Sequence, residues 1–358
     1  MELAAVRAPT NLLESSPMTV STAIRSALTL AVLASACSIQ RQKPESGALD
    51  DHMSHMMPAD MVGPVASARG VTSGGDTPGL PASNNFAAAR LKASPRHAEW
   101  VKIAWEPGAT DSLMAWIVYP TTSNAKTPVV VVIHEIFGLS TWVRGVADQI
   151  AADGFIAIAP DLVSRVRGGP STVELSGDSA RGIIGQVNIA ERNRGITAVA
   201  NYAMSQASAA PRYAVIGYCW GGSTTWGAAI NNGKGFSGGV AFYGSFPYMN
   251  GAVPNADSLA KIGKPVMLLN GSKDARIGAS MPGIDSAMKA NGKEYFGKNY
   301  EGAIHGFLRA QDDPRTLPAT APDSLVNAAK AEAAANLAAT ADGWPRTIAF
   351  LKKNLGVK

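Results

Sequence analysis

A cysteine between glycines is the residue of this chain best suited to nucleophilic chemistry. Residues 213–222 form a strand pattern that runs into Gly-x-Cys-x-Gly-Gly, and a helical pattern begins at Ser223. This arrangement is the nucleophile elbow, with cysteine in place of serine. Because the turn is tight, Gly217 and Gly221 must lack Cβ atoms, and Cys219 must take a strained backbone. The helix N-terminus is expected to favour the Cys219 thiolate; a buried, inert cysteine is the alternative.

A nucleophile at such an elbow needs a base and an acid that orients the base. The chain has five histidines, and only His305 follows Cys219, in a loop after a strand pattern. Asp274 comes just after the strand pattern Pro265–Asn270, where loops of α/β proteins carry functional residues. Asp285 is the competing acid, but it falls inside a helical pattern. The order nucleophile, acid, histidine is the one α/β-hydrolases use, so a Cys219, Asp274, His305 triad is expected.

The chemistry expected from this triad is acyl transfer in two halves. The Cys219 thiolate attacks an ester or lactone carbonyl and forms a thioester, while the Trp220 backbone N–H holds the oxyanion. His305, oriented by Asp274, then assists water in cleaving the thioester. Neither a metal nor an organic cofactor is required.

Short apolar runs and helical stretches supply the elements that must position these residues. The expected strands are Val101–Trp105, Ala115–Tyr119, Val129–Ile133, Phe155–Ala159, Tyr213–Gly217, Gly239–Tyr243, Pro265–Asn270 and Glu294–Tyr300. The expected helices are Trp142–Asp153, Val187–Ser205, Ser223–Asn231 and Trp344–Leu355. The alternation predicts the α/β class, with a mostly parallel central sheet covered by helices on both faces. The first two runs predict an antiparallel hairpin at its edge.

The segment from Val101 to Lys358 resembles the dienelactone hydrolase family, and so predicts an α/β-hydrolase fold. A Glu-Ile-Phe-Gly loop combined with a cysteine elbow separates this family from serine esterases. The matching pieces are His134–Leu139, Ala159–Leu162, Gly217–Gly222, Gly271–Asp274 and His305–Phe307.

The resemblance implies roles that spacing alone does not reveal. Glu135 is implied to hold a neutral resting thiol and to take its proton when substrate binds; burial makes a carboxylate a stronger base. The alternative for Glu135 is a loop carboxylate that caps the next helix. The Ile136 backbone N–H is implied to complete the oxyanion hole with that of Trp220. His134 is interpreted as a structural imidazole.

Substrate contacts are also implied by the resemblance. Arg309 matches a position where the family binds a substrate carboxylate, and a solvated surface arginine is the alternative. Tyr243 is a second candidate for substrate contact, although Phe242 stands where the family often has another tyrosine. The family's second carboxylate-binding arginine has no clear counterpart, with Arg167 and Arg181 available nearby. An Ala-rich segment, 311–340, is expected to be partly helical and to cover the site.

The amino-terminal residues predict export. After Arg25 an uncharged run of 11 residues ends in Ala-Ser-Ala and is followed by Cys37. The run is shorter than the ~17–25 residues that span a bilayer, and suits a signal peptide. Residues 1–37 resemble a bacterial lipoprotein signal with Cys37 as the lipidated residue; an ordinary signal peptide is the alternative. Residues 38–90 are predicted to form a flexible linker. Its Met and His residues at 51–57 could bind copper, but a simple tether is the favoured interpretation. Residues 91–358 are predicted to form the catalytic domain.

The amino-acid composition excludes several classes of protein and of binding partner. The 358 residues are 46% hydrophobic and 16% charged, with a mean hydropathy of +0.03, which excludes a wholly disordered chain and a polytopic membrane protein. The net charge is +5 but no block of basic residues occurs, so nucleic acid is not an expected partner. The expected partner is a small ester or lactone, and the resemblance implies that it can carry a carboxylate. Membrane contact is expected only through a lipid anchor. Amide or peptide hydrolysis on the same triad and a non-catalytic exported ligand-binding lipoprotein are the alternatives.

Overall fold

The computed structural model describes residues 76–122, 126–171, 175, 177–311 and 317–357. The expected signal peptide, its Cys37 and the Met- and His-containing segment 51–57 lie outside the described residues. Within the described ranges, no helix is both long enough and apolar enough to cross a membrane.

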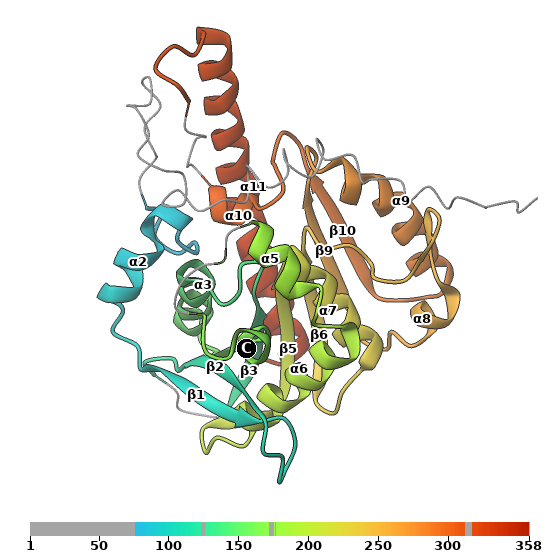
Figure 1. Ribbon diagram of the computed structural model, residues 1–358. Coiled ribbons are helices and arrows are strands. Elements are labelled where there is room, and N and C mark those ends of the chain that lie inside the picture. Colours follow the sequence, from blue (N-terminus) through green and yellow to red (C-terminus); the bar gives the residue numbers. More distant parts are fainter. Residues whose placement is uncertain (1–75, 123–125, 172–174, 176, 312–316, 358) are drawn as a thin grey trace, which may run out of the picture. The chain divides into compact units, whose positions relative to one another are not determined.

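Eight strands of the described residues form one sheet, in the order β1-β2-β4-β3-β5-β6-β9-β10 (Figure 1). They are β1 Ala98–Ala104, β2 Ser112–Val118, β3 Thr127–Ile133, β4 Ile156–Asp161, β5 Ala209–Tyr218, β6 Phe236–Phe242, β9 Val266–Gly271 and β10 Tyr295–Tyr300. Strands β4, β3, β5, β6, β9 and β10 run parallel to one another. Strands β1 and β2 form an antiparallel hairpin, and β2 pairs antiparallel with β4 at the edge of the sheet. A separate short ribbon pairs β7 Met249–Asn250 with β8 Val253–Pro254. The expected fold class is confirmed.

Helices cover both faces of this sheet. They are α2 Asn84–Ala93, α3 Thr141–Ala152, α4 Ser164–Arg167, α5 Gly177–Ile184, α6 Ile189–Met204, α7 Trp220–Asn231, α8 Ala256–Ala260, α9 Ala275–Ala290, α10 Phe307–Ala310 and α11 Asp323–Leu355. In Figure 1, α6 and α7 lie in front of the sheet and α11 runs behind it. Side chains of β3 alternate between two apolar cores: Val129 and Val131 join α6, α7 and α9, whereas Val130 and Val132 join α3 and α11. All seven residues of β3 are buried, as expected for a central parallel strand.

Two boundaries differ from those expected. The linker was expected to reach residue 90, but helix α2 begins at Asn84. Ala87 of this helix is 1% exposed, and the Ala82 carbonyl before it accepts a hydrogen bond from the Trp142 indole. Packed structure therefore begins before residue 90. The C-terminal helix was expected from Trp344, but α11 begins at Asp323 and continues through Pro345. The Ala-rich stretch before Pro345 has high helix propensity, which explains the longer helix.

Candidate active site

The elbow has the backbone strain that its glycines predict. Cys219 joins β5 to α7 with φ 55° and ψ −114°, in a region of positive φ that non-glycine residues rarely adopt. A Cβ at Gly221 would collide with the carbonyl oxygens of Ile133 and His134, and one at Gly217 would collide with the Gly221 carbonyl. The two glycines let the turn approach β3 closely and leave Cys219 half-buried at the helix N-terminus.

The thiol at this elbow is held in its neutral form. Burial, together with the nearby Glu135 charge, raises the pKa of Cys219 to about 12. The Trp220 N–H donates to the sulfur and Arg276 lies within electrostatic reach, and both act in the opposite direction. The N–H group at the helix N-terminus thus favours a thiolate, as expected, but desolvation outweighs it in this resting state. The neutral thiol implied by the family resemblance agrees with the geometry.

The expected acid and histidine are hydrogen-bonded to each other. The distance between His305 Nδ1 and Asp274 Oδ2 is 2.6 Å, and the two side chains are 3% and 0% exposed. Asp274 Oδ1 accepts a hydrogen bond of 3.1 Å from the Ile277 N–H, so the same carboxylate caps α9. The cap and the His305 bond use different oxygens and fix the carboxylate in one orientation. Asp285, the competing acid, lies within α9 as expected.

Glu135 lies in the loop after β3, where a cation holds it. Its Oε2 is 3.0 Å from Arg309 Nε, and the side chains are 2% and 6% exposed. Burial raises the pKa of the Glu135 carboxyl, and the Arg309 guanidinium partly offsets this effect. Glu135 Oε1 accepts no hydrogen bond from the described residues and so has capacity to accept a proton. The alternative role for Glu135 is wrong, because Ser140 caps α3.

His134, next to Glu135, has a structural role. Its Nε2 accepts a hydrogen bond from the Leu162 N–H at 3.1 Å, so Nδ1 carries the proton and donates to the Glu135 carbonyl at 2.6 Å. Burial lowers the pKa of this imidazole, which stacks on the Trp220 indole with ring centroids 5.3 Å apart. Both ring nitrogens are engaged, so His134 fixes the loop that presents Glu135.

The strand order brings the candidate residues to one edge of the sheet. Glu135, Cys219, Tyr243, Asp274 and His305 each follow the carboxyl end of a strand, in the spatial order β3, β5, β6, β9 and β10. Ligands of α/β proteins bind at this edge. Tyr243 packs against the histidine, with its ring centroid 4.8 Å from that of His305. The edge therefore holds a thiol, a carboxylate and an Asp-bound imidazole in neighbouring positions.

Apolar side chains cover the sulfur from one side. Ile136, Phe137 and Ala180 form a small buried cluster, and Cys219 and Trp220 pack against it. Ala180 belongs to α5, so this helix covers the loop that carries Ile136. The cluster places Ile136 and Trp220, the two residues expected to supply the oxyanion-hole N–H groups, on the same side of Cys219.

Comparison with known proteins identifies the family of the chain. Residues 113–355 match the family model described as the dienelactone hydrolase family, and the match covers more than half of the chain. The chain belongs to the dienelactone hydrolase family. The matched range includes the residues at the carboxyl edge of the sheet, from Glu135 to His305.

Relatives within the dienelactone hydrolase family are distant. A protein of Salmonella typhimurium named as a carboxymethylenebutenolidase is 30% identical over 174 residues, which are 48% of this chain and 64% of that relative. The chain thus spans slightly less than two thirds of that relative's length. A protein of Escherichia coli K12 with the same name is 27% identical over 256 residues, 70% of this chain and 86% of the relative. A crystal structure described as a dienelactone hydrolase from Klebsiella pneumoniae has a TM-score of 0.55 at 23% identity, over 71% of this chain and 98% of that chain, and shows the shared fold.

The residues expected to contact substrate lie in surroundings that differ from those expected. Arg309 is 5% exposed, so the alternative of a solvated surface arginine is wrong, and its charge is engaged by Glu135. Tyr243 is fully buried with φ 38°, which favours a role in holding the His305 ring over direct substrate contact. Arg167 donates to Ser171 Oγ at 3.1 Å within the loop after β4, and Arg181 lies on α5.

Helix α11 braces the two loops that carry the acid and the histidine. Asn336 Oδ1 accepts a hydrogen bond of 3.0 Å from the Ile304 N–H, directly before His305. Glu332 Oε2 is 2.8 Å from Lys273 Nζ, directly before Asp274. The sequence pattern predicted that segment 311–340 covers the site, but it did not indicate a role for these two side chains. Their four-residue spacing in an Ala-rich stretch, which places them on one helical face, was the available signal.

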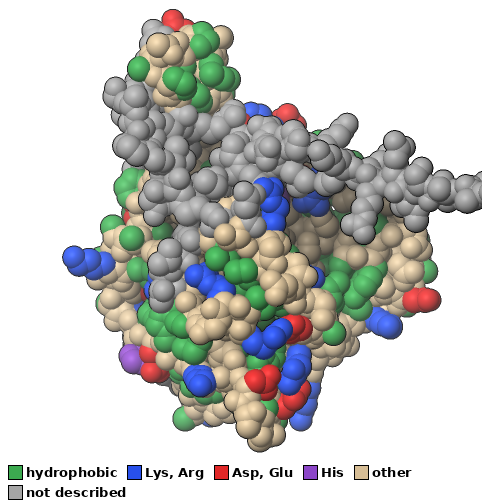
Figure 2. Space-filling model, viewed as in Figure 1, with side chains coloured by type: hydrophobic (Ala, Val, Ile, Leu, Met, Phe, Trp, Pro, Cys, Tyr) green, Lys and Arg blue, Asp and Glu red, His purple; other side chains and the backbone are tan. Residues whose placement is uncertain are grey.

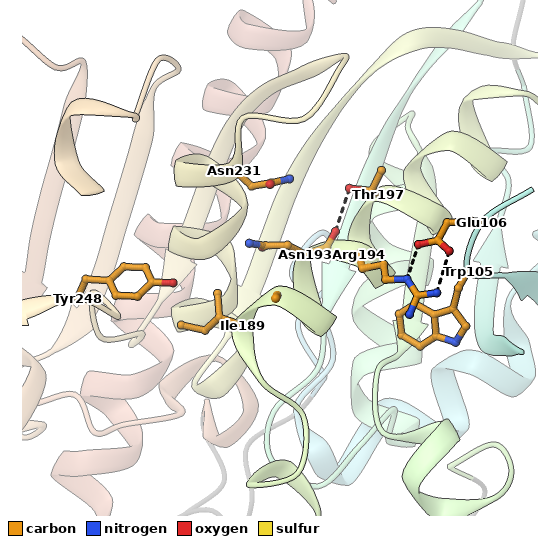
Figure 3. Close-up of a pocket in the computed structure, with 9 residues that line it drawn as sticks. Trp105, Glu106, Ile189, Asn193, Arg194, Thr197, Asn231 and Tyr248 are labelled. Carbon is orange, nitrogen blue, oxygen red and sulfur yellow. Dashed lines mark hydrogen bonds and ion pairs between the residues drawn. The ribbon is translucent and has the colours of Figure 1, made fainter. Parts of the chain in front are cut away.

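A hollow of about 480 Å³ lies elsewhere, along α6 and the end of α7 (Figure 3). Asn193, Arg194 and Thr197 of α6 line it, and the Arg194 guanidinium pairs with Glu106 on its rim. None of the expected site residues lines this hollow, so it is separate from the candidate site. On the face shown in Figure 2, lysine and arginine side chains are dispersed among acidic ones.

Proposed function

We propose that this protein hydrolyses carboxylic esters or lactones through a Cys219, His305, Asp274 triad with a thioester intermediate. The observation that carries the proposal is the 2.6 Å hydrogen bond from His305 Nδ1 to Asp274, at the same edge as the cysteine elbow. That bond fixes the tautomer in which Nε2 can accept a proton. The names of the Salmonella and Escherichia coli relatives support a lactone substrate.

Activation of the thiol is proposed to proceed through Glu135. In the resting state the Arg309 cation stabilises the Glu135 carboxylate, and the thiol is neutral. Substrate binding that moves Glu135 away from Arg309 removes this stabilisation, and the buried Glu135 then binds a proton more tightly. The thiol proton moves to Glu135 and on to His305 Nε2, and the resulting imidazolium and the Trp220 N–H stabilise the thiolate.

The two halves of the reaction conserve atoms and protons. The sulfur attacks the carbonyl carbon, the Ile136 and Trp220 N–H groups hold the oxyanion, and the C–O bond breaks. The proton that left the thiol passes to the departing oxygen by way of His305. His305 then takes a proton from water, the resulting hydroxide attacks the thioester, the C–S bond breaks, and His305 returns that proton to the sulfur. The products are the carboxylic acid and the alcohol.

Hydrolysis of 4-nitrophenyl acetate and of a dienelactone by the wild type and by Cys219→Ala tests the proposal. The wild type is expected to hydrolyse at least one of the two, and Cys219→Ala neither above background. Equal rates for the two proteins would remove the cysteine mechanism.

We also propose an exported location, with Cys37 as the lipid attachment residue. The support is the short apolar run and the small residues that precede Cys37. Metabolic labelling with a radioactive fatty acid tests this: label is expected in the wild type and absent from Cys37→Ser, and unlabelled wild type contradicts it.

A further inference from the structure

A second hollow, of about 390 Å³, opens beside the catalytic edge of the sheet. The segment after β6, the β7–β8 ribbon and the first turns of α9 line it. Its walls include apolar Phe246 and Met249 and polar Ser245, Arg276 and Ser280. The hollow thus combines an apolar surface with one cationic group.

The same loops that carry site residues border this hollow. Ser245 comes two residues after Tyr243, and Arg276 comes two residues after Asp274. The Arg276 charge also lowers the proton affinity of Cys219, against the larger effect of burial, so the guanidinium lies within electrostatic reach of the sulfur. A group bound to Arg276 therefore lies at the same edge of the sheet as Cys219.

Arg276 is available for a ligand in a way that Arg309 is not. Its side chain is exposed and donates to Ser245 Oγ, and no carboxylate of the described residues pairs with it. Arg309, by contrast, is buried and holds Glu135. A guanidinium has five N–H donors and binds a carboxylate with two of them, so one bond to a serine leaves room for an anion.

We propose that this hollow is a substrate subsite, in which Arg276 binds a carboxylate and Phe246 and Met249 contact the apolar chain that carries it. The proposal rests on the proposed hydrolysis at Cys219, and it places the substrate carboxylate against α9, away from Arg309. Ser245 orients the guanidinium toward the hollow.

Two matched substrate pairs test the subsite. The acyl pair is 4-nitrophenyl hydrogen adipate and its neutral methyl ester, and the alcohol pair is 3-acetoxybenzoate and its neutral methyl ester. For Arg276→Gln, the ratio of kcat/KM for the anionic over the neutral member is expected to fall ~10- to 100-fold in one pair, mainly through KM. Arg276→Lys is expected to restore part of the ratio, and Arg212→Gln, an exposed arginine near the start of β5, to leave it at the wild-type value.

Alkylation gives a second readout that does not depend on turnover. Iodoacetate carries a carboxylate and iodoacetamide is its neutral analogue. The ratio of their rates at Cys219, followed by mass spectrometry of its peptide, is expected to fall several-fold in Arg276→Gln, and the difference to shrink with added salt.

The outcomes separate this subsite from the catalytic proposal. Unchanged substrate ratios in both pairs together with an unchanged alkylation ratio would overturn the subsite, while hydrolysis lost in Cys219→Ala still supports the triad. Hydrolysis that persists in Cys219→Ala overturns the cysteine mechanism and the subsite's role in it.

Discussion

Arg309 and Glu135 form a buried ion pair, with 3.0 Å between Arg309 Nε and Glu135 Oε2. Arg309 lies four residues after His305, and Glu135 acts on the thiol of Cys219. A single ion pair thus links the loop of the histidine to the proton affinity of the nucleophile.

Glu135→Gln is expected to make Cys219 more reactive as a free thiol. Removing the negative charge lowers the pKa of Cys219, which burial and Glu135 raise to about 12. In the wild type the rate of alkylation by iodoacetamide should therefore still rise with pH at about pH 10, well above the ordinary thiol pKa of ~8.5. At any fixed lower pH, Glu135→Gln should react faster than the wild type, as measured by mass spectrometry of the Cys219 peptide.

The exposed Glu301→Gln is the matched control for this measurement and should follow the wild-type profile. A wild-type rate that levels off below neutral pH would show a preformed thiolate and contradict the neutral resting state.

Arg309→Gln is expected to destabilise the fold in a pH-dependent way. Without its cation, the buried Glu135 carboxylate costs ~3–5 kcal/mol of unfolding free energy near neutral pH. Burial already raises the pKa of this carboxyl above its unfolded value, and the substitution raises it further. The folded state then binds the proton more tightly than the unfolded state, so the loss grows as pH rises from about 4 toward 8 and is smallest at the acid end.

Urea unfolding at a series of pH values measures this loss. Glu135→Gln combined with Arg309→Gln should recover part of the stability at neutral pH, because no buried carboxylate remains. A loss in Arg309→Gln that is constant across pH would show that the ion pair is not its source.

The chemistry at the strand ends could be predicted from the sequence because local patterns mark it. Glycines on both sides of Cys219 indicate the tight turn, and Asp274 and His305 each follow a strand pattern in the sequence. The partner of Arg309 could not be predicted, because Glu135 lies far away in the chain and only the strand order brings the β3 loop beside α10. The neutral state of Cys219 likewise depends on burial that no local pattern reports.

Asp274→Asn separates the two functions of this carboxylate. Asparagine keeps an oxygen to cap α9 through the Ile277 N–H but no longer stabilises an imidazolium at His305. We expect kcat to fall ~10⁴-fold with little change in melting temperature. Asp274→Ala should lose comparable activity and also ~0.5–2 kcal/mol of unfolding free energy, because the cap is lost. Kinetics and thermal unfolding of the two variants check this; equal melting temperatures for both would refute the cap.

Asn336→Ala tests the brace from α11. The Ile304 N–H would lose its buried acceptor, at a cost of ~1–3 kcal/mol of unfolding free energy. Because His305 is the next residue, kcat should fall with KM little changed. Asn327→Ala, at an exposed position of the same helix, is the control and should be neutral or slightly stabilising. Equal unfolding curves and kcat values for the two variants would mean that α11 does not support the site.

The helices that were missed or shortened show where local patterns fail. Helix α2 has no clear apolar stripe, so periodicity does not mark it; Ala87 packs closely on Gly145 of α3. Helix α11 continues through Pro345, where local rules predict a break. Trp344, 1% exposed in the core, shows the packing that compensates for the lost backbone bond.

The most direct test of the account is to trap the acyl group on the protein. His305→Gln, mixed with 4-nitrophenyl acetate and quenched in acid, should accumulate one acetyl group, because the thioester forms but water is not activated to cleave it. Peptide mapping by mass spectrometry should place that acetyl group on Cys219, and the same treatment of Cys219→Ala should leave the corresponding peptide unmodified. An acetyl group on any other residue, or wild-type hydrolysis that persists in Cys219→Ala, would contradict the central claim.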